Sequence, residues 1–223
     1  MSASLIERTP SAYYYPLLIK HLLHTPLETA PEQVIVYQDI SRYNYRTLGQ
    51  RISRLASGLA KLGVRPGNTV AVMDWDSHRY LECYFAIPMM GAVLQTVNIR
   101  LSPEQILYTG ADVILCNTDF LPILDSIKDR LKTAKIFVML SDGGDDAQRP
   151  PISISFAAEY EDLLARGTED FDFPDFDENT RATTFYTTAT TGGPKISICL
   201  VGRPSSAVQP CQRAWRSWLW TGG

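Results

Sequence analysis

The sequence lacks any long run of apolar residues. Its longest nearly apolar stretch, Tyr84–Leu94, contains Pro88 and Gly91 and is far shorter than the ~20 residues that a helix needs to cross a bilayer. The sequence also lacks an excess of positive charge, since its 223 residues carry a formal net charge of -3. We therefore expect no transmembrane segment, and we see no electrostatic basis for binding nucleic acid.

Several signature motifs are absent as well. The chain has no G-x-x-x-x-G-K-[ST] loop, no G-x-G-x-x-G fingerprint and no G-x-S-x-G elbow. These absences exclude a Walker A site, a dinucleotide-binding turn and an α/β-hydrolase nucleophile. The four cysteines, Cys83, Cys116, Cys199 and Cys211, contain no C-x-x-C pair. They fit a reducing compartment, with Cys83 and Cys116 expected to be buried thiols.

Histidine is scarce, with three in the chain. His21 and His24 could share a helix face, but no further ligands accompany them, so a zinc site is not expected. His78 follows Asp76 and Ser77, a pattern that is explained more simply by a helix cap than by a catalytic group.

Targeting signals are also missing. Residues 1–10 contain no basic stretch followed by an apolar one, and the final residues, Trp220–Gly223, are not a peroxisomal tripeptide. The default expectation is therefore a cytoplasmic protein, and a peroxisomal address remains open for an intact gene product with a different C-terminus.

The densest cluster of chemistry lies late in the chain. Residues 186–195 read Tyr-Thr-Thr-Ala-Thr-Thr-Gly-Gly-Pro-Lys. Threonine hydroxyls and the N–H groups of a glycine-rich backbone can donate hydrogen bonds to an anion, and a lysine adds a positive charge. The segment is typical of a loop that holds phosphate, although a Thr/Gly cluster taken alone is equally typical of an exposed turn.

The upstream pattern predicts an α/β fold. Short apolar runs bounded by turn formers predict buried strands at 70–73, 93–97, 113–116 and 136–140. Helical patterns lie between them at about 78–90, 102–109 and 120–132. Strands that alternate with helices indicate right-handed crossovers and a largely parallel sheet with flanking helices.

An earlier helix is predicted from Leu48 to Leu62. Apolar residues recur there at three- and four-residue steps, Thr47 can cap the start, and Gly63 ends it. The opposite face is expected to be solvated and carries Arg46, Gln50, Arg51, Arg54 and Lys61. Residues 141–151 are expected to form an exposed loop, and residues 169–178 a linker held down by its phenylalanines.

The order of residues in the Thr/Gly segment resembles a known signature. Y-T-T-x-T-T-G-x-P-K is similar to the phosphate loop of the AMP-forming acyl-CoA synthetases and related adenylate-forming ligases, Y-[TS]-[TSG]-G-T-T-G-x-P-K-G. The resemblance continues through 43–48, 63–72, 80–93, 98–106 and 177–180, in the family's order, and covers about residues 12–195. Within that family the chain looks most like medium- and long-chain fatty acyl-CoA ligases.

This resemblance implies a chemistry. Such enzymes join a carboxylic acid, here a fatty acid, to AMP from ATP with Mg²⁺, and then transfer the acyl group to coenzyme A. By resemblance, the loop would bind the β- and γ-phosphates, and Lys195 would balance their charge. The implied phosphate-binding residues are Thr187, Thr188, Thr190, Thr191, Gly192, Gly193 and Lys195. No catalytic residue and no metal ligand is assigned, because the family's other active-site motifs follow the phosphate loop.

The chain departs from the family pattern in three places. Ala189 stands where the family has glycine, and its Cβ would strain any positive φ by roughly 1 kcal/mol. Between Leu107 and Val113 about four residues fewer occur than the family pattern contains, which would remove one helical turn. After Lys195, residues 196–223 show a shift in composition, with three of the four tryptophans.

These departures shape the expected domain organisation. Residues 1–195 are interpreted as a partial AMP-binding domain that ends at the phosphate loop, and residues 196–223 as a frame-shifted or intron-derived, poorly ordered tail. The sequence predicts a truncated acyl-CoA ligase that is inactive alone. The alternative is a non-catalytic fragment that binds nucleotide without turnover, or a partner through the surface left uncovered by truncation.

Overall fold

A computed structural model describes residues 9–13, 15–107, 110–143, 152–187 and 195–200 of the chain. The helices are α1 (Ile19–Thr29), α2 (Tyr45–Lys61), α3 (His78–Met89), α4 (Pro103–Ile106), α5 (Leu121–Ile127) and α6 (Tyr160–Arg166), and two 3₁₀ turns are η1 (Thr118–Phe120) and η2 (Lys128–Arg130). The strands are β1 (Val34–Tyr37), β2 (Ser41–Asn44), β3 (Thr69–Met73), β4 (Val93–Thr96), β5 (Val113–Asn117), β6 (Ile136–Leu140), β7 (Ala158–Glu159), β8 (Arg181–Thr187) and β9 (Lys195–Leu200).

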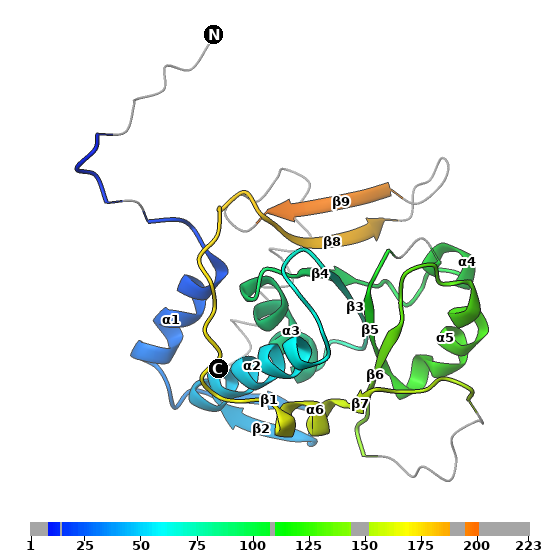
Figure 1. Cartoon of the computed structure of the whole chain (residues 1–223). Coiled ribbons are helices and arrows are strands. Elements are labelled where there is room, and N and C mark those ends of the chain that lie inside the picture. Colours follow the sequence, from blue (N-terminus) through cyan, green and yellow to red (C-terminus); the bar gives the residue numbers. More distant parts are fainter. Residues whose placement is uncertain (1–8, 14, 108–109, 144–151, 188–194, 201–223) are drawn as a thin grey trace.

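A mostly parallel sheet forms the centre of the molecule (Figure 1). Its strand order is β7-β6-β5-β3-β4-β8-β9, and within it only the β8–β9 pair is antiparallel. A separate two-stranded sheet pairs β1 with β2. The predicted α/β class is confirmed, and all four strands expected from apolar runs are present.

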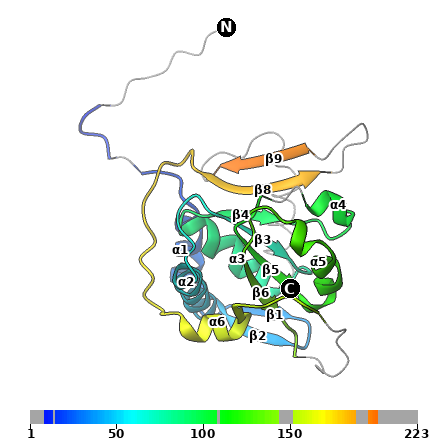
Figure 2. The same ribbon diagram turned by 45° about the vertical axis from the view of Figure 1, so that its right-hand side comes forward.

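Helices cover both faces of this sheet (Figure 2). Along β3, Val70 and Val72 point into a first core cluster with α2, α3 and α6, while Ala71 and Met73 point into a second one with α4 and α5. A strand buried on both faces needs an uninterrupted apolar run, because successive side chains alternate between the faces. This explains why these strands were visible in the sequence.

Helix α2 starts earlier than its apolar pattern suggests. Asn44 is the N-cap, and its side chain accepts a hydrogen bond from the N–H of Thr47 at 2.9 Å. The prediction that Thr47 caps the helix is therefore wrong: Thr47 lies inside the first turn as the donor to that cap. The predicted end is confirmed, since Gly63 follows the helix with φ of +97°, a conformation that favours glycine.

The charged face of α2 is less solvated than expected. The side chain of Arg51 is largely buried and reaches Glu82 of α3 and Glu161 of α6. Arg54 pairs with Glu169, and Lys61 donates to the carbonyl of Arg166. The helical wheel gave the direction of these side chains correctly, but α6 and the segment after it pack along that face.

Helix α3 begins as predicted, with Ser77 as its N-cap accepting from the N–H of Tyr80. The other two helical patterns form shorter pieces. Within the described residues the pattern at 102–109 gives the single turn of α4, which starts with a capping box of Ser102 and Gln105. The pattern at 120–132 gives η1, α5 and η2 in succession.

Residues 168–180, which we call the strap, connect α6 to β8 without forming a helix or strand. Figures 1 and 2 both show the strap, in yellow, running beside α1 and α2. Phe171 and Phe173 pack on the first core cluster, which confirms the predicted linker held by phenylalanines. Lys20 of α1 forms an ion pair with Asp175 at 2.5 Å and donates to the carbonyl of Phe173.

Other predictions are settled in part. Cys83 and Cys116 are buried thiols, as expected. Across the described part of the chain, no helix is long and apolar enough to span a membrane. Most of the predicted loop at 141–151 lies outside the described residues. β9 runs from Lys195 to Leu200, so the predicted boundary after residue 195 falls within a hairpin strand. Residues 201–223 lie outside the described residues, and the two-part division of the chain stays a prediction.

Candidate nucleotide-phosphate site

The carboxyl ends of five parallel strands, β3, β4, β5, β6 and β8, lie along one edge of the sheet. In open α/β sheets, ligands bind outside this edge. The Thr/Gly segment follows directly from β8, whose neighbour is β4 through the pairs Leu94–Thr183 and Thr96–Phe185. The fold therefore puts Thr187, the last residue of β8, at the edge where α/β proteins bind their ligands.

The two ends of that loop are fixed against each other. Thr187 is the last residue of β8 and Lys195 the first of β9, and the two are direct partners in the antiparallel register. The structure thus brings together two of the seven predicted phosphate-binding residues at the base of a hairpin. The other five, Thr188, Thr190, Thr191, Gly192 and Gly193, lie outside the described residues together with Ala189, so their predicted role stays a prediction.

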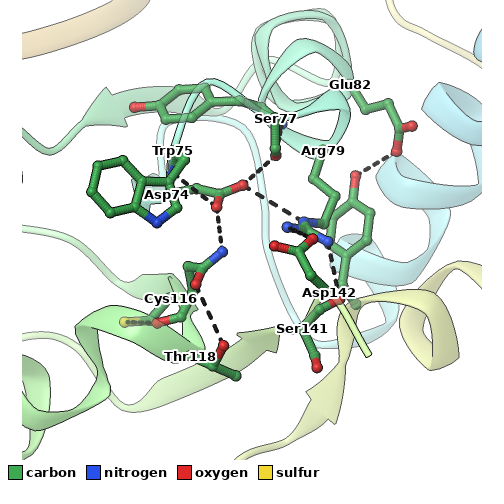
Figure 3. Close-up of polar contacts among 12 residues, drawn as sticks. Asp74, Trp75, Ser77, Arg79, Glu82, Cys116, Thr118, Ser141 and Asp142 are labelled. Carbon is green, nitrogen blue, oxygen red and sulfur yellow. Dashed lines mark hydrogen bonds and ion pairs between the residues drawn. The ribbon is translucent and has the colours of Figure 1, made fainter. Parts of the chain in front are cut away.

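A buried polar group occupies the same edge two strands away (Figure 3). Asp74, just after β3, accepts hydrogen bonds from Asn117 at the end of β5 at 2.7 Å and from its neighbour Trp75 at 2.9 Å. Its other oxygen accepts from Ser77 and lies 3.6 Å from Nε of Arg79. We call Asp74, Ser77, Arg79, Asn117 and Asp142 the Asp74 network.

This network closes the topological switch point of the sheet. The chain moves from β3 to β4 on one side and then returns to place β5 on the other, so the switch lies between β3 and β5. Asp74 and Asn117 fill that position by bonding to each other, and Trp75 adds a second link by donating to Asp119 at 2.8 Å. Side-chain hydrogen bonds therefore join the strand ends at the position where ligands bind in many open α/β sheets.

The chemistry of Asp74 is that of a structural group. Burial raises the pKa of its carboxyl, against hydrogen bonds from Ser77 and Asn117 and the charge of Arg79, which lower it. Its two oxygens accept three hydrogen bonds, all from groups of the chain itself. Asp74 therefore links the end of β3 to the end of β5 and to the start of α3.

Arg79 extends the network to β6. Its guanidinium donates to the carbonyl of Ser141 at 3.0 Å and to the carboxylate of Asp142 at 2.7 Å, both just after that strand. The side chain is almost fully buried, and within the described residues its Nε has no hydrogen-bond partner. One arginine on the first turn of α3 thus holds the loop that leaves β6.

A second buried carboxylate, Glu82, joins four elements. It accepts from Arg51 of α2 at 2.7 Å, from Tyr43 of β2 at 2.8 Å and from Tyr160 of α6 at 2.6 Å. Burial raises the pKa of Glu82, while Arg51 and the two hydroxyls lower it. All of these contacts are internal, so Glu82 holds the helical layer together and does not belong to a site.

Local sequence patterns indicate these two acids but not their partners. Asp74 precedes Ser77 by three residues at a strand-to-helix junction, which looks like an ordinary cap. Glu82 is the one acid within the otherwise apolar stretch 80–90, and such an isolated acid on a buried helix signals a paired charge. Neither pattern could name Asn117 or Tyr160, which approach only through the fold.

His78 agrees with its structural interpretation. His78 is 4% exposed and lies against the rings of Tyr37 and Tyr43, with centroids at 5.2 and 6.2 Å. Burial, helped by the charges of Arg79 and Arg51, lowers its pKa to about 4, so the ring is neutral and enclosed at neutral pH. Among the described residues no group of His, Cys, Asp and Glu is arranged to hold a metal ion, His21 and His24 included.

Comparison with known families decides the identity. The sequence profile of the AMP-binding enzyme family matches residues 23–199. The chain belongs to the AMP-binding enzyme family. The match spans the sheet and helices described above and includes the hairpin that holds the Thr/Gly segment, so the resemblance seen in the sequence is confirmed.

Curated relatives in this family are acyl-CoA ligases. A 3-methylmercaptopropionyl-CoA ligase of Ruegeria lacuscaerulensis is 33% identical over 188 residues, which cover 81% of this chain and 34% of the relative. A medium-chain-fatty-acid–CoA ligase of Ectopseudomonas oleovorans is 35% identical and covers 70% of this chain and 29% of the relative. A long-chain-fatty-acid–CoA ligase of Thermus thermophilus is 37% identical, and the match covers 70% of this chain and 28% of the relative.

Solved structures show the same fold. The anthranilate CoA ligase AuaEII, in complex with anthranoyl-AMP, superposes with a TM-score of 0.73 at 21% identity and covers 85% of this chain and 35% of the ligase. A fatty acyl-CoA synthetase of Mycobacterium tuberculosis gives a TM-score of 0.68 at 18% identity, with 82% and 34% covered. The chain thus spans about a third of the length of the curated relatives it matches.

Proposed function

We propose that this chain carries the triphosphate-binding loop of an AMP-forming fatty acid–CoA ligase and has no turnover alone. The observation that carries this proposal is the hairpin base: Thr187 and Lys195 are paired where β8 ends, at the ligand-binding edge of the sheet. A segment whose two ends are paired loses less conformational freedom when it binds phosphate than a segment with free ends. Membership of the AMP-binding enzyme family supports the choice of ATP as the ligand.

In the complete ligase, the proposed reaction has two steps. A carboxylate oxygen of the acid attacks the α-phosphorus of ATP, the bond between the α- and β-phosphates breaks, and pyrophosphate leaves. The thiol of coenzyme A then attacks the acyl carbon, loses its proton, and AMP leaves. Adenylation is needed because a free carboxylate has no good leaving group, whereas acyl-AMP has one.

The proposed part of this chain in the first step is electrostatic. Charge builds on the β- and γ-phosphates as pyrophosphate departs, and preorganised donors at that position stabilise it. Lys195 would supply the positive charge. The hydroxyl and N–H donors would come from Thr187, Thr188, Thr190, Thr191, Gly192 and Gly193.

Magnesium would supply further neutralisation of the phosphates. Within the part of the chain that the structure describes, no cluster of acids or histidines is arranged to hold the ion. Mg²⁺ bound to nucleotides is commonly held by phosphate oxygens and water with few protein ligands. We therefore treat it as part of the incoming ATP.

Absence of turnover is proposed because the chain spans about a third of its curated relatives. The acid-binding pocket, the adenine contacts and the coenzyme A site belong to the whole protein and are not assigned to residues here. The relatives are named for different acids, among them 3-methylmercaptopropionyl, medium-chain and long-chain substrates. A fatty acid is the substrate class that we propose.

Two assays on the purified chain test this. The first measures ATP–pyrophosphate exchange with fatty acids of several lengths, where we expect no exchange. The second measures ATP binding by calorimetry in the original chain, in Lys195→Ala and in Lys132→Ala. Lys132 is exposed before β6, at the opposite, amino edge of the sheet, so it is a matched control for loss of one lysine.

The outcomes are distinct. ATP binding that is lost in Lys195→Ala but kept in Lys132→Ala supports the phosphate loop. Equal affinity in both variants contradicts the assigned role of Lys195. Exchange by the chain alone contradicts the absence of turnover. A chain that binds no ATP, binds the dye ANS strongly and unfolds without cooperativity is an incompletely folded fragment.

A second proposed function is association with another polypeptide. β9 is the final strand on its side of the sheet, and no strand among the described residues pairs with its outer edge. An unpaired edge offers N–H and C=O groups to another strand. We propose that a partner polypeptide, such as the rest of a ligase, binds at this edge. Analytical sedimentation of the chain, with and without the remaining part of a ligase, measures whether a complex forms. A monomer in both mixtures contradicts it.

The proposed compartment is the cytoplasm, and the peroxisome is the alternative for a complete gene product. A plant relative from Arabidopsis thaliana, 31% identical, is named as a peroxisomal acetate/butyrate–CoA ligase. Imaging of a fluorescent fusion distinguishes a diffuse signal from a peroxisomal one.

A further inference from the structure

A groove of about 620 Å³ lies between α1, the first half of α2 and the strap. Its lining includes the apolar side chains Leu23, Leu27, Met89 and Phe173. Two side chains of α1, Lys20 and His24, line it as well. The groove lies on the helical layer, away from the carboxyl edge of the sheet, and has no part in the proposed phosphate site.

The charges around this groove do not cancel. Three of its charged side chains are already paired: Lys20 with Asp175, Arg46 with Glu32 and Glu169 with Arg54. The remaining two are Glu28 and Asp170, and neither has an ion-pair partner among the described residues. The groove therefore offers an apolar surface with two unpaired acids, which favours an occupant that is apolar and cationic.

The described part of the chain ends at Leu200, within reach of the groove. β9 is antiparallel to β8, so it ends with Leu200 opposite Arg181, the first residue of β8. The strap reaches Arg181 directly from Phe173 in the groove, and these eight residues extend over at most about 27 Å. Leu200 therefore lies at the end of the sheet that the strap joins, and the 23 residues after it could span up to about 75 Å if fully extended.

The composition of residues 201–223 matches what the groove lacks. This segment contains no acidic residue. It carries Arg203, Arg213 and Arg216, and its tryptophans are Trp215, Trp218 and Trp220. Arginine and tryptophan are the side chains that most often dominate binding surfaces.

We propose that residues 201–223 bind in the α1–strap groove of the same chain, with arginines facing Glu28 and Asp170 and tryptophans on the apolar surface. A covalently attached segment meets the groove at a high effective concentration, which favours it over a second copy. Such a contact would tie the end of the chain to its first helix.

Disulfide trapping tests this in the full chain. A thiol is introduced in the groove by His24→Cys, and next to it but outside the groove by Thr25→Cys; both positions are exposed. The partner thiol is the natural Cys211. We expect an intramolecular link to Cys211 at least about tenfold faster from position 24 than from position 25, because a thiol held close has a raised effective concentration.

Neutralising the acids is the second part of the test. In the double variant Glu28→Gln/Asp170→Asn, the rate from position 24 should fall to that from position 25. Equal rates from both positions, no effect of the double variant, or links that form mainly between two chains would each overturn the proposal. The last result would make a second copy the occupant.

A separate measurement avoids any change to His24. In a Trp75→Phe background the fluorescence comes from the three tryptophans of the tail. We expect Glu28→Lys/Asp170→Lys to increase quenching by acrylamide at least twofold, while Asp129→Lys, at an exposed acid on η2, leaves it unchanged. Tryptophans quenched as strongly before the change as after it would contradict binding.

Discussion

Arg51 and Glu82 form the central ion pair of the helical layer, with Nε and Oε1 2.7 Å apart. Glu82 has no exposed side-chain surface, and Arg51 also reaches the carboxylate of Glu161 at 2.7 Å. The pair connects α2 to α3 and, through Glu161, to α6. Both oxygens of the buried Glu82 accept hydrogen bonds from protein donors, which are Arg51, Tyr43 and Tyr160.

Removing one partner of this pair should be strongly destabilising. We expect Arg51→Ala to lower the free energy of unfolding by about 3–5 kcal/mol, because it leaves Glu82 buried without its counter-charge. Arg54→Ala, one turn away on the same helix, is the matched control: its pair with Glu169 is 38% and 42% exposed, and such pairs contribute about 0–1 kcal/mol. Urea unfolding of both variants measures the difference. Similar losses in the two would contradict this account.

Two glycines of α2 should respond in opposite ways to alanine. A Cβ at Gly58 would lie 2.8 Å from the carbonyl oxygen of Leu163 on α6, so Gly58→Ala should destabilise by about 1–3 kcal/mol. At Gly49 the nearest atom is a terminal methyl of Leu27 at 3.2 Å, which can move. Gly49→Ala should stabilise by up to about 1 kcal/mol through helix propensity. Thermal unfolding checks both signs, and a neutral Gly58→Ala would show that α6 moves freely.

The contribution of His78 to stability should fall as the pH falls from 7 to 5. The unfolded state protonates His78 near its ordinary pKa of 6.5, while the folded state does so only at about 4, so protons favour unfolding between these values. The expected loss is about 2 kcal/mol by pH 5.

The variant His78→Phe isolates this contribution. Asp74 and Glu82 have raised pKa values in the folded state, so their protonation stabilises the fold as the pH falls. The quantity to measure is therefore the difference in unfolding free energy between the original chain and the variant at each pH. We expect urea midpoints of His78→Phe to decline less with acid, and those of the exposed His24→Gln to follow the original chain. Parallel curves for all three proteins would contradict the assignment.

Alanine at position 189 should weaken ATP binding by the proposed phosphate loop. The family signature has glycine there, and a Cβ penalises a positive φ by roughly 1 kcal/mol or more. Ala189→Gly should therefore tighten ATP binding by about fivefold, measured by calorimetry, with no change in the unfolding midpoint beyond the ordinary effect of glycine. Unchanged affinity would show that the loop does not use that conformation.

Much of the fold was predictable because it rests on local patterns. Val70–Met73 is apolar at every position and is bounded by turn formers, which is typical of a short strand buried on both faces. Ser77 at a strand-to-helix junction predicts the start of α3, and Gly63 predicts the end of α2. The order of threonines and glycines before Lys195 identified the candidate phosphate loop and, with the upstream motifs, the family.

The rest was hidden because it depends on contacts across the chain. Arg51 lies on the polar side of its helical wheel, and nothing in α2 shows that Glu82 and α6 cover it. Asp74 and Asn117 each look like local caps, and their contact follows from placing β5 beside β3. The side chain of Thr47 is suited to a helix cap, yet Asn44 takes that position one turn earlier.

The strap between α6 and β8 also has a consequence for how the protein folds. Strands β3 to β7 assemble from neighbouring stretches of sequence, whereas β8 must return along the strap to pair with β4, which is far back in the chain. Contacts between distant residues form slowly, because a long loop must close first. During synthesis, the body of the sheet can therefore form before β8 arrives, and the hairpin that holds Thr187 and Lys195 is expected to be the last part to acquire its shape.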